Sequence, residues 1–399
     1  MQTLPPNTIR KTTGKHRLLV TLIHMIDGFA TSAGTARYRD RFPSLAHAGH
    51  FRQPAAPGVS DLWLSSIGLG TYLGETDVAS DISYTQSIEQ ALRSGINVLD
   101  TAINYRHQRS ERNIGVAITH LIDSGELHRD EVLVCTKAGY LPFDTELPAD
   151  QRDYLRKEYV ETGVAPSGEI AGGMHCMAAS YLDDQLERSR RNTGFGTLDV
   201  FYLHNPESQL GYVPADTFRD RLRNAFRWAE DAVKDKRIRW YGIATWNALR
   251  VAPGDRSYMS LEQVLDIAHD AGGDDHHFRF VQLPLNLAMT EAYGLGNQTL
   301  RGERGSVLSL AEQYGIAVVA SATLHQGQLT HGLPEKLKEV MGLDSDTETA
   351  VQFVRSAPGL ATALIGMSRP DHVLENVKVA SRPLMTIEEW EGLFSPAES

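Results

Sequence analysis

The chain has 399 residues, of which 41% are hydrophobic and 22% are charged, and its formal net charge is −11. These proportions are typical of a globular protein and leave room for one large domain with extensions. The negative charge argues against a protein that binds nucleic acid, because contact with the phosphate backbone requires clustered positive charge.

The first part of the chain, residues 1–64, precedes the first predicted strand. We expect it to form a partly irregular N-terminal extension. Two of its segments, Arg37–Phe42 and His50–Gln53, are predicted to pair as a hairpin that covers the bottom of the domain that follows.

The sequence favours a cytoplasmic location. The apolar stretch Leu18–Ala30 follows basic residues, as in a signal peptide, but His24 and Asp27 interrupt it. The two cysteines, Cys135 and Cys176, do not make a disulfide framework, so a reducing compartment is expected. The sequence has no run of 18 apolar residues, and we expect no membrane contact.

From residue 65 to 399 the sequence alternates between short apolar runs and longer helical patterns. The predicted strands are Ser66–Leu69, Ile96–Asp100, Val132–Lys137, Leu198–Leu203, Trp240–Ala244, Phe278–Leu283, Ile316–Ser321 and Ala361–Ile365. The helices that follow them are predicted to begin near Asp81, Ser110, Ser180, Pro214, Ser260, Gly305, Asp346 and Pro370. Eight such units predict an α/β fold, a (β/α)8 TIM barrel.

An open, doubly wound sheet is the alternative fold. It would require a phosphate-binding glycine loop after the first strand. The glycines of the segment Gly68–Gly74 resemble such a loop, but their last spacing is one residue too long and no helix begins at Gly74. We therefore interpret the segment as the end of the first barrel strand.

A long insertion, residues 140–177, separates the third predicted strand from its helix. Tyr154, Leu155 and Tyr159 suggest a helix within it, and Ser180 is the predicted N-cap of the helix that follows. Loops of this length are commonly functional or disordered. Its place at the C-terminal face of the barrel makes it a candidate lid, and a purely structural insertion is the alternative.

Four reactive side chains stand at the ends of consecutive predicted strands. They are Asp100, Tyr105, Lys137 and His204. Strand C-termini meet on the face of a barrel that carries its chemistry, so we expect the four side chains to lie together. Taken alone, each residue also has a purely structural explanation. Asp100 can cap a turn and Tyr105 can be a packed core aromatic, while Lys137 can be solvated and His204 can be an interior histidine.

Together the four residues predict a proton donor. A nearby ammonium lowers the pKa of a phenol, and a lowering of about two units requires about 2.7 kcal/mol. Asp100 can hold Lys137 charged, and His204 can hydrogen-bond a substrate oxygen. Tyr105 would then give its proton to a carbonyl oxygen.

Several motifs in order resemble the aldo-keto reductase family. They are Asp100–Tyr105 with Ser110-Glu111, Cys135–Lys137, Tyr202–Glu207, Gly242–Asn247, Val281-Gln282 and Ile365–Asn376. The resemblance covers about residues 65–380. It implies a (β/α)8 barrel and reversible hydride transfer between a nicotinamide cofactor and a carbonyl or alcohol, without a metal. It also implies that Tyr105 is the proton donor, that Lys137 and Asp100 tune it, and that His204 orients the carbonyl.

The same resemblance implies a cofactor site for NADP, with NAD possible. Ser368 and Arg369 are the predicted partners of a 2′-phosphate, and Asn376 that of the adenine. The family's usual Ser-Asn after strand 5 is here Ala244-Thr245, and no aromatic stands near Ser321. The predicted cofactor-binding residues are Gly70, Thr71, Thr245, Gln282, Ser321, Gln326, Met367, Ser368, Arg369, His372 and Asn376.

The predicted substrate-binding residues are Tyr72, Arg106, Arg109 and Trp246. Arg106 stands where the family usually has glycine, directly after the tyrosine. The planar fork of an arginine suits carboxylate or polyhydroxylated groups. Alternatively, the two arginines form ion pairs with Glu111 or with an acidic residue of the insertion.

The leading hypothesis is an NAD(P)-dependent oxidoreductase that acts on an aldehyde, a ketone or a sugar-like alcohol. One alternative is elimination or epimerisation on the same fold, and another is a non-catalytic regulatory subunit. The expected partner is a small carbonyl or polyol substrate, and the oligomeric state is left open. We expect no metal site, and we interpret the acidic and histidine-rich stretch Asp274–His277 as a solvated turn.

Overall fold

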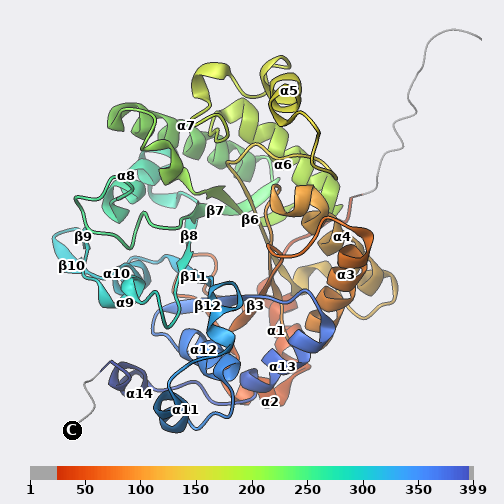
Figure 1. The fold of residues 1–399 in the computed structure, drawn as a ribbon, viewed down its shortest axis with the longest axis vertical. Coiled ribbons are helices and arrows are strands. Elements are labelled where there is room, and N and C mark those ends of the chain that lie inside the picture. Colours follow the sequence, from red (N-terminus) through yellow and green to blue (C-terminus); the bar gives the residue numbers. More distant parts are fainter. Residues whose placement is uncertain (1–24, 395–399) are drawn as a thin grey trace, which may run out of the picture.

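The structure, a computed structural model, describes residues 25–394. Eight parallel strands close into a barrel and follow one another around it in chain order (Figure 1). The barrel strands are β3 (Ile67–Gly70), β4 (Val98–Asp100), β5 (Leu133–Ala138), β6 (Leu198–His204), β7 (Ile238–Ala244), β8 (Phe278–Pro284), β11 (Ala317–Ser321) and β12 (Leu360–Gly366). The predicted TIM barrel and its eight strands are confirmed, with their ends shifted by one or two residues.

Eight helices follow the barrel strands and surround them (Figure 1). They are α3 (Val78–Arg93), α4 (Arg109–Asp123), α6 (Ala179–Thr193), α7 (Ala215–Lys234), α8 (Leu261–Gly272), α10 (Val307–Gln313), α12 (Asp346–Arg355) and α13 (Pro370–Ala380). Local sequence sets several of their ends. Asp77 caps α3 through the Ser80 amide, and Gly194 ends α6 in the left-handed conformation.

The N-cap predicted for α6 is wrong. Ala178 occupies that position and makes no side-chain cap, while Ser180 Oγ donates to the carbonyl oxygen of Val164 at 2.9 Å. Ser180 is therefore drawn into a contact with the insertion. The remaining short elements are α1 (Ser32–Asp40), α2 (Pro43–His47), α5 (Gln151–Leu155), α9 (Glu291–Gly294), α11 (Glu335–Met341), α14 (Ile387–Gly392), and the hairpin of β9 (Gln298–Leu300) and β10 (Glu303–Gly305).

The N-terminal extension closes the end of the barrel opposite the strand C-termini. Val59 and Leu62 are buried in one hydrophobic cluster with Val98 and Leu133, the first residues of β4 and β5. Most of the apolar stretch considered as a leader lies outside the described residues. Within residues 25–394, no helix is both long and apolar enough to cross a membrane.

The hairpin predicted between residues 37–42 and 50–53 does not form. Residues 37–40 belong to helix α1, because Thr31 caps that helix and Tyr38 is fully buried against the carbonyl oxygens of Leu92 and Ile96. The strand at residues 51–52, β1 (Phe51–Arg52), pairs instead with β2 (Leu64–Ser65) in an antiparallel ladder. The extension therefore holds a helix and a different hairpin.

His50, fully buried just before β1, should make the protein sensitive to acid. Its ring nitrogens lie 2.9 Å from Ser66 Oγ and 3.0 Å from the Gly95 carbonyl oxygen. Burial and the charge of Arg355 lower the pKa of His50 from 6.5 to about 3. Between these two pKa values the unfolded chain binds a proton at His50 and the folded chain does not. The free energy of unfolding therefore falls as the pH falls below about 6.5.

We expect His50 to account for a loss of about 2 kcal/mol in the free energy of unfolding between about pH 7 and pH 5. His50→Gln keeps a donor for the Gly95 carbonyl oxygen and cannot titrate in this range. Urea unfolding of both proteins at the two pH values measures the difference. An identical pH dependence in the wild type and the variant would show that His50 does not contribute.

Candidate active site

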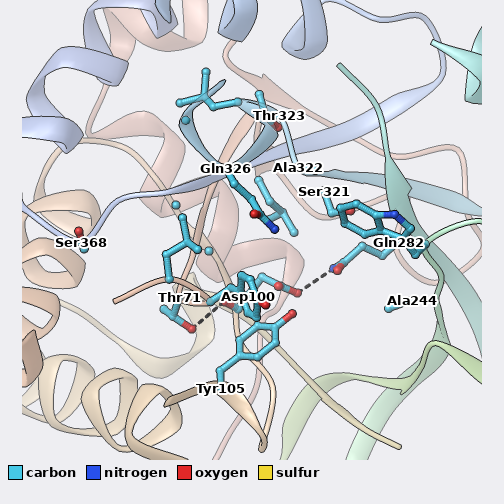
Figure 2. A pocket seen from close by; sticks show the side chains of 18 of the residues that line it. Thr71, Asp100, Tyr105, Ala244, Gln282, Ser321, Ala322, Thr323, Gln326 and Ser368 are labelled. Carbon is cyan, nitrogen blue, oxygen red and sulfur yellow. Dashed lines mark hydrogen bonds between the residues drawn. The ribbon is translucent and has the colours of Figure 1, made fainter. Parts of the chain in front are cut away.

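A cavity of about 820 Å³ opens at the C-terminal ends of the barrel strands. Its wall comes from residues at or just past those ends. In Figure 2, Thr71, Asp100, Gln282 and Ser321 approach one space from β3, β4, β8 and β11. This is the face on which barrels of this kind carry their chemistry.

The predicted catalytic residues meet at this face. Lys137 Nζ lies 2.5 Å from Asp100 Oδ2, 2.8 Å from the Thr101 carbonyl oxygen and 3.3 Å from the Tyr105 hydroxyl. Gln282 Nε2 donates to the other Asp100 oxygen at 2.8 Å. Lys137 has no exposed side-chain surface, so it stands behind the cavity, whereas Asp100 and Tyr105 line it.

The Asp100–Lys137 pair is built to keep the lysine charged. Burial disfavours the ammonium, but Asp100 and Tyr105 outweigh it, so the pKa of Lys137 is raised above its ordinary value. Burial raises the pKa of Asp100, and the donors from Lys137 and Gln282 act against that shift. Since both Asp100 oxygens accept hydrogen bonds, the geometry is that of a carboxylate.

Tyr105 carries its proton at neutral pH. Burial raises the pKa of its phenol above 10, and the nearby Lys137 charge only partly opposes that shift. Lys137 acts in the direction expected from the sequence and lowers this pKa, but the loss of hydration is the larger effect, so the net shift is upward. A protonated phenol directed at a cavity is nevertheless the form that a proton donor requires.

His204 is neutral and has a free ring nitrogen. Burial, followed by the charge of Lys137, lowers its pKa well below 6.5. Its ring lies edge-on to Tyr105 at a centroid distance of 5.7 Å and to Tyr140 at 5.3 Å. Among residues 25–394, its Nδ1 has no hydrogen-bonding partner. His204 lines the cavity, so the ring nitrogen that faces the cavity can hold a ligand oxygen beside the Tyr105 hydroxyl.

Most of the predicted cofactor-binding residues line the same cavity. Gly70, Thr71, Thr245, Gln282, Ser321, Gln326, Ser368, His372 and Asn376 do so. Met367 and Arg369 do not. Met367 is fully buried, and its carbonyl oxygen accepts from Ser87 Oγ at 2.7 Å. Arg369 occupies the N-cap position of α13 and is exposed.

Three cavity residues carry buried polar atoms that have no partner within residues 25–394. These atoms are Thr245 Oγ1, Thr323 Oγ1 and Asn376 Oδ1. Buried polar groups are normally hydrogen-bonded, so orphaned polar atoms on several residues of the cavity wall suit a polar ligand. Asn376 Nδ2 is already used, because it donates to the His372 carbonyl oxygen at 2.8 Å.

The predicted aromatic substrate residues reach the cavity. Tyr72 lies against Tyr105 with ring centroids 5.0 Å apart, and it is 55% exposed. Trp246 lines the wall opposite β3, just past β7. The Trp246 amide donates to Glu207 Oε1 at 2.7 Å, which fixes the loop that presents the indole.

Arg106 and Arg109 are not in the cavity wall. Both guanidinium groups bind Asp81, Arg106 to one carboxylate oxygen at 2.7 Å and Arg109 to the other at 2.5 Å. An ion pair was the alternative left open by the sequence, but its partner is on α3, neither Glu111 nor a residue of the insertion. The predicted substrate role of the two arginines thus has no support in the geometry.

The backbone at these ion pairs with Asp81 is strained. Arg106, His107 and Gln108 have φ values of 48°, 53° and 69°, directly after Tyr105. A left-handed backbone costs a residue other than glycine about 1–2 kcal/mol. Arg106 offsets part of that cost, because its side chain also donates to the Glu75 carbonyl oxygen and to Asn113 Oδ1, each at 2.8 Å.

The insertion does not cover the cavity. It holds the helix predicted around Tyr154, which is α5 and continues as a π-helical turn, Arg156–Val160. Tyr159 packs edge-on against Tyr181 of α6, and Figure 1 shows α5 beside α6 and α7. Of residues 140–177, only Tyr140 lines the cavity. The lid prediction therefore has no support in this structure.

Several cavity residues were missed by the sequence analysis. Tyr140 and Asn205 closely follow β5 and β6. They could have been identified from the sequence, because residues just past the C-terminal ends of barrel strands lie at the cavity. Thr330 and Thr347 come from loops and helices distant in sequence, and no motif marks them. Within residues 25–394, no group of three or more His, Cys, Asp or Glu side chains is placed to hold a metal.

The sequence of the whole barrel matches one known family. The profile that describes the aldo/keto reductase family aligns with residues 66–393. The chain belongs to the aldo/keto reductase family. This family member has the barrel and the cavity described above, and the resemblance found in its sequence motifs is thereby confirmed.

Three proteins to which the chain is similar share about a fifth of its sequence. The chain is 23% identical over 351 residues to the "Putative voltage-gated potassium channel subunit beta" of Schizosaccharomyces pombe, covering 82% of this chain and 89% of that protein. It is 21% identical over 362 residues to the uncharacterized oxidoreductase YqkF of Bacillus subtilis, covering 85% and 94%. An aldo-keto reductase from Klebsiella pneumoniae, crystallised in complex with NADPH, superposes with a TM-score of 0.56 at 18% identity, covering 88% and 97%.

Proposed function

We propose that this aldo/keto reductase is an NAD(P)-dependent oxidoreductase that reduces an aldehyde, a ketone or a sugar-like carbonyl, with Tyr105 as the proton donor. One observation carries the proposal. A partly buried, protonated phenol lies 3.3 Å from the Lys137 ammonium and lines a cavity beside the neutral His204. Family membership supports the general assignment as an oxidoreductase.

The residues present fit a nicotinamide cofactor. Thr245 and Ser321 line the same cavity as Tyr105 and are the proposed contacts of the nicotinamide end, and the orphaned Asn376 Oδ1 suits the amino group of an adenine. Ser368 and Arg369 are the proposed partners of a 2′-phosphate. The Klebsiella pneumoniae relative in complex with NADPH supports this choice of cofactor. When bound, the cofactor would supply the hydride that reduces the carbonyl carbon.

Each catalytic side chain has a separate task in this proposal. His204 holds the carbonyl oxygen through the ring nitrogen that faces the cavity and so orients the substrate. Tyr105 gives its proton to the same oxygen as negative charge develops there. The charge of Lys137, held by Asp100, stabilises the phenolate that remains. Burial of Asp100, Lys137 and His204 keeps water from screening these interactions.

A second candidate is a non-catalytic binding or regulatory subunit on the same barrel. The similarity to the protein of Schizosaccharomyces pombe named as a channel subunit motivates it. A binding subunit has no need of the buried Asp100–Lys137 pair beneath Tyr105, which is a costly arrangement to maintain. The geometry therefore favours an enzyme.

Incubation of the purified protein with NADPH or NADH and a panel of carbonyl compounds tests the proposal. We expect oxidation of the reduced cofactor that depends on the added carbonyl. Tight binding of NADPH without turnover of any aldehyde, ketone or sugar would favour the binding subunit instead.

The choice between the two cofactors should depend on Arg369. Its guanidinium makes no ion pair within residues 25–394, and it starts the helix that lines the adenosine end of the cavity. Hydrogen bonds to charged groups contribute about 1.5–3 kcal/mol, so Arg369→Ala should weaken NADPH binding about tenfold or more and leave NADH binding unchanged. Lys378→Ala, at the other end of α13, is the matched control. Equal changes in the Kd of NADPH and NADH would refute the role.

A further inference from the structure

The backbone beneath His204 is held by a side chain of the insertion. His175 Nε2 lies 2.8 Å from the carbonyl oxygen of His204, the last residue of β6. That oxygen also faces Gly139, where a Cβ atom would approach it to 2.5 Å. The end of β6 is therefore closely enclosed, and His175 supplies the hydrogen-bond donor for its last carbonyl group.

The direction of this hydrogen bond fixes the tautomer of His175. A carbonyl oxygen only accepts, so His175 Nε2 carries the proton and Nδ1 must accept. Gln209 Nε2 lies 3.1 Å from Nδ1 and can donate to it. Burial lowers the pKa of His175 to about 4, which keeps the ring neutral and preserves this arrangement. Protonation would abolish the acceptor.

Gln209 is oriented in turn by Arg221 of α7. Arg221 Nη1 donates to Gln209 Oε1 at 2.8 Å, so the amide nitrogen of Gln209 must face His175. The same guanidinium donates to the Gly168 carbonyl oxygen at 2.6 Å and pairs with the Glu169 carboxylate at 2.8 Å. A continuous series of donors thus runs from α7 and the insertion to the backbone of His204.

The ring of His204 depends on this support. Its Nδ1 has no partner among the described residues, and aromatic contacts are its main lateral restraints. One of them, Tyr140, also packs edge-on against His175 at 5.1 Å and pairs with it across an antiparallel bridge. A shift of His175 would therefore reach His204 both through the backbone and through Tyr140.

We infer that His175 is a positioning residue, through which the insertion sets the orientation of His204 toward the substrate oxygen. The inference rests on the proposed carbonyl reduction. It assigns residues 140–177 a supporting role under the catalytic histidine in place of the lid expected from the sequence. A misplacement of about 1 Å in a catalytic group costs on the order of a hundredfold in rate.

The test compares two substitutions of His175 with a matched control. His175→Leu removes the donor, and His175→Gln places an amide N–H near the position of Nε2. His50 is the control, since it is also buried and also hydrogen-bonds a backbone carbonyl group, but at the other end of the barrel. We expect His175→Leu to lower kcat by about ten- to a hundredfold, with the Kd of NADPH unchanged. His175→Gln should recover kcat to within about threefold of the wild type, and His50→Leu should not lower it.

A second measurement does not need turnover. The 13C signal of the His204 ring, identified by its loss in His204→Gln, should shift in His175→Leu, return toward the wild-type position in His175→Gln and stay unchanged in His50→Leu. If His175→Leu and His50→Leu affect both kcat and this signal alike, the inference is wrong. A wild-type protein that reduces no carbonyl would refute the proposed function, and the 13C signal would still decide whether His175 positions His204.

Discussion

Tyr105→Phe is expected to abolish carbonyl reduction and to leave cofactor binding unchanged. The substitution removes only the hydroxyl that lies 3.3 Å from Lys137 Nζ and keeps the aromatic ring. A positioned proton donor contributes about 10²–10⁴ to the rate, so kcat should fall by at least about a hundredfold. The Kd of NADPH, measured by quenching of protein fluorescence, should stay within about twofold of the wild type, because the phenol is not needed to hold the cofactor.

Tyr72→Phe is the matched control for this prediction. Tyr72 lines the same cavity and its ring packs against that of Tyr105, but within residues 25–394 it makes no hydrogen bond with Lys137. Its hydroxyl should therefore matter little for kcat. If Tyr105→Phe retains more than about a tenth of the wild-type kcat, or if Tyr72→Phe loses as much, Tyr105 is not the proton donor.

Lys137→Met is expected to lower both activity and stability. It removes the charge that stabilises the Tyr105 phenolate, so turnover should fall severely. It also leaves the Asp100 carboxylate buried without its cation, and breaking a buried pair in this way costs about 3–5 kcal/mol of the free energy of unfolding. Urea unfolding at neutral pH measures the loss.

The stability loss should depend on Asp100. The double variant Lys137→Met with Asp100→Asn removes both charges, so it should regain part of the stability but none of the activity. Since burial already raises the pKa of Asp100, the single variant should be less destabilised, relative to the wild type, as the pH falls and Asp100 takes up a proton. A double variant no more stable than Lys137→Met would contradict this account of the pair.

The barrel and the clustering of the four side chains proposed for catalysis could be predicted because both follow from short-range patterns. Buried parallel strands appear as apolar runs, and all residues of β5 and β6 are indeed buried. A reactive residue placed directly after such a run must lie at the C-terminal face once the barrel closes. This is why Lys137 and His204 could be assigned to one site before the geometry was known.

The parts that could not be predicted depend on partners distant in the sequence. Its position after Tyr105 makes Arg106 resemble a substrate-binding residue in the sequence. In the folded protein it pairs with Asp81 of α3. The insertion resembled a lid because nothing in the sequence shows that α5 packs toward α6 and away from the cavity. The pKa of Tyr105 depends on the balance between burial and the Lys137 charge, and the depth of burial is a property of the folded barrel alone.

The most direct test of the proposed reaction follows the transferred hydrogen itself. The wild-type protein is incubated with NADPH deuterated at its transferable hydrogens and with a carbonyl compound that supports turnover, and the alcohol is analysed by mass spectrometry and NMR. We expect the alcohol to carry deuterium at the former carbonyl carbon, and Tyr105→Phe to yield no labelled product. An alcohol without the label, or labelled product from Tyr105→Phe at the wild-type rate, would contradict hydride transfer with Tyr105 as the proton donor.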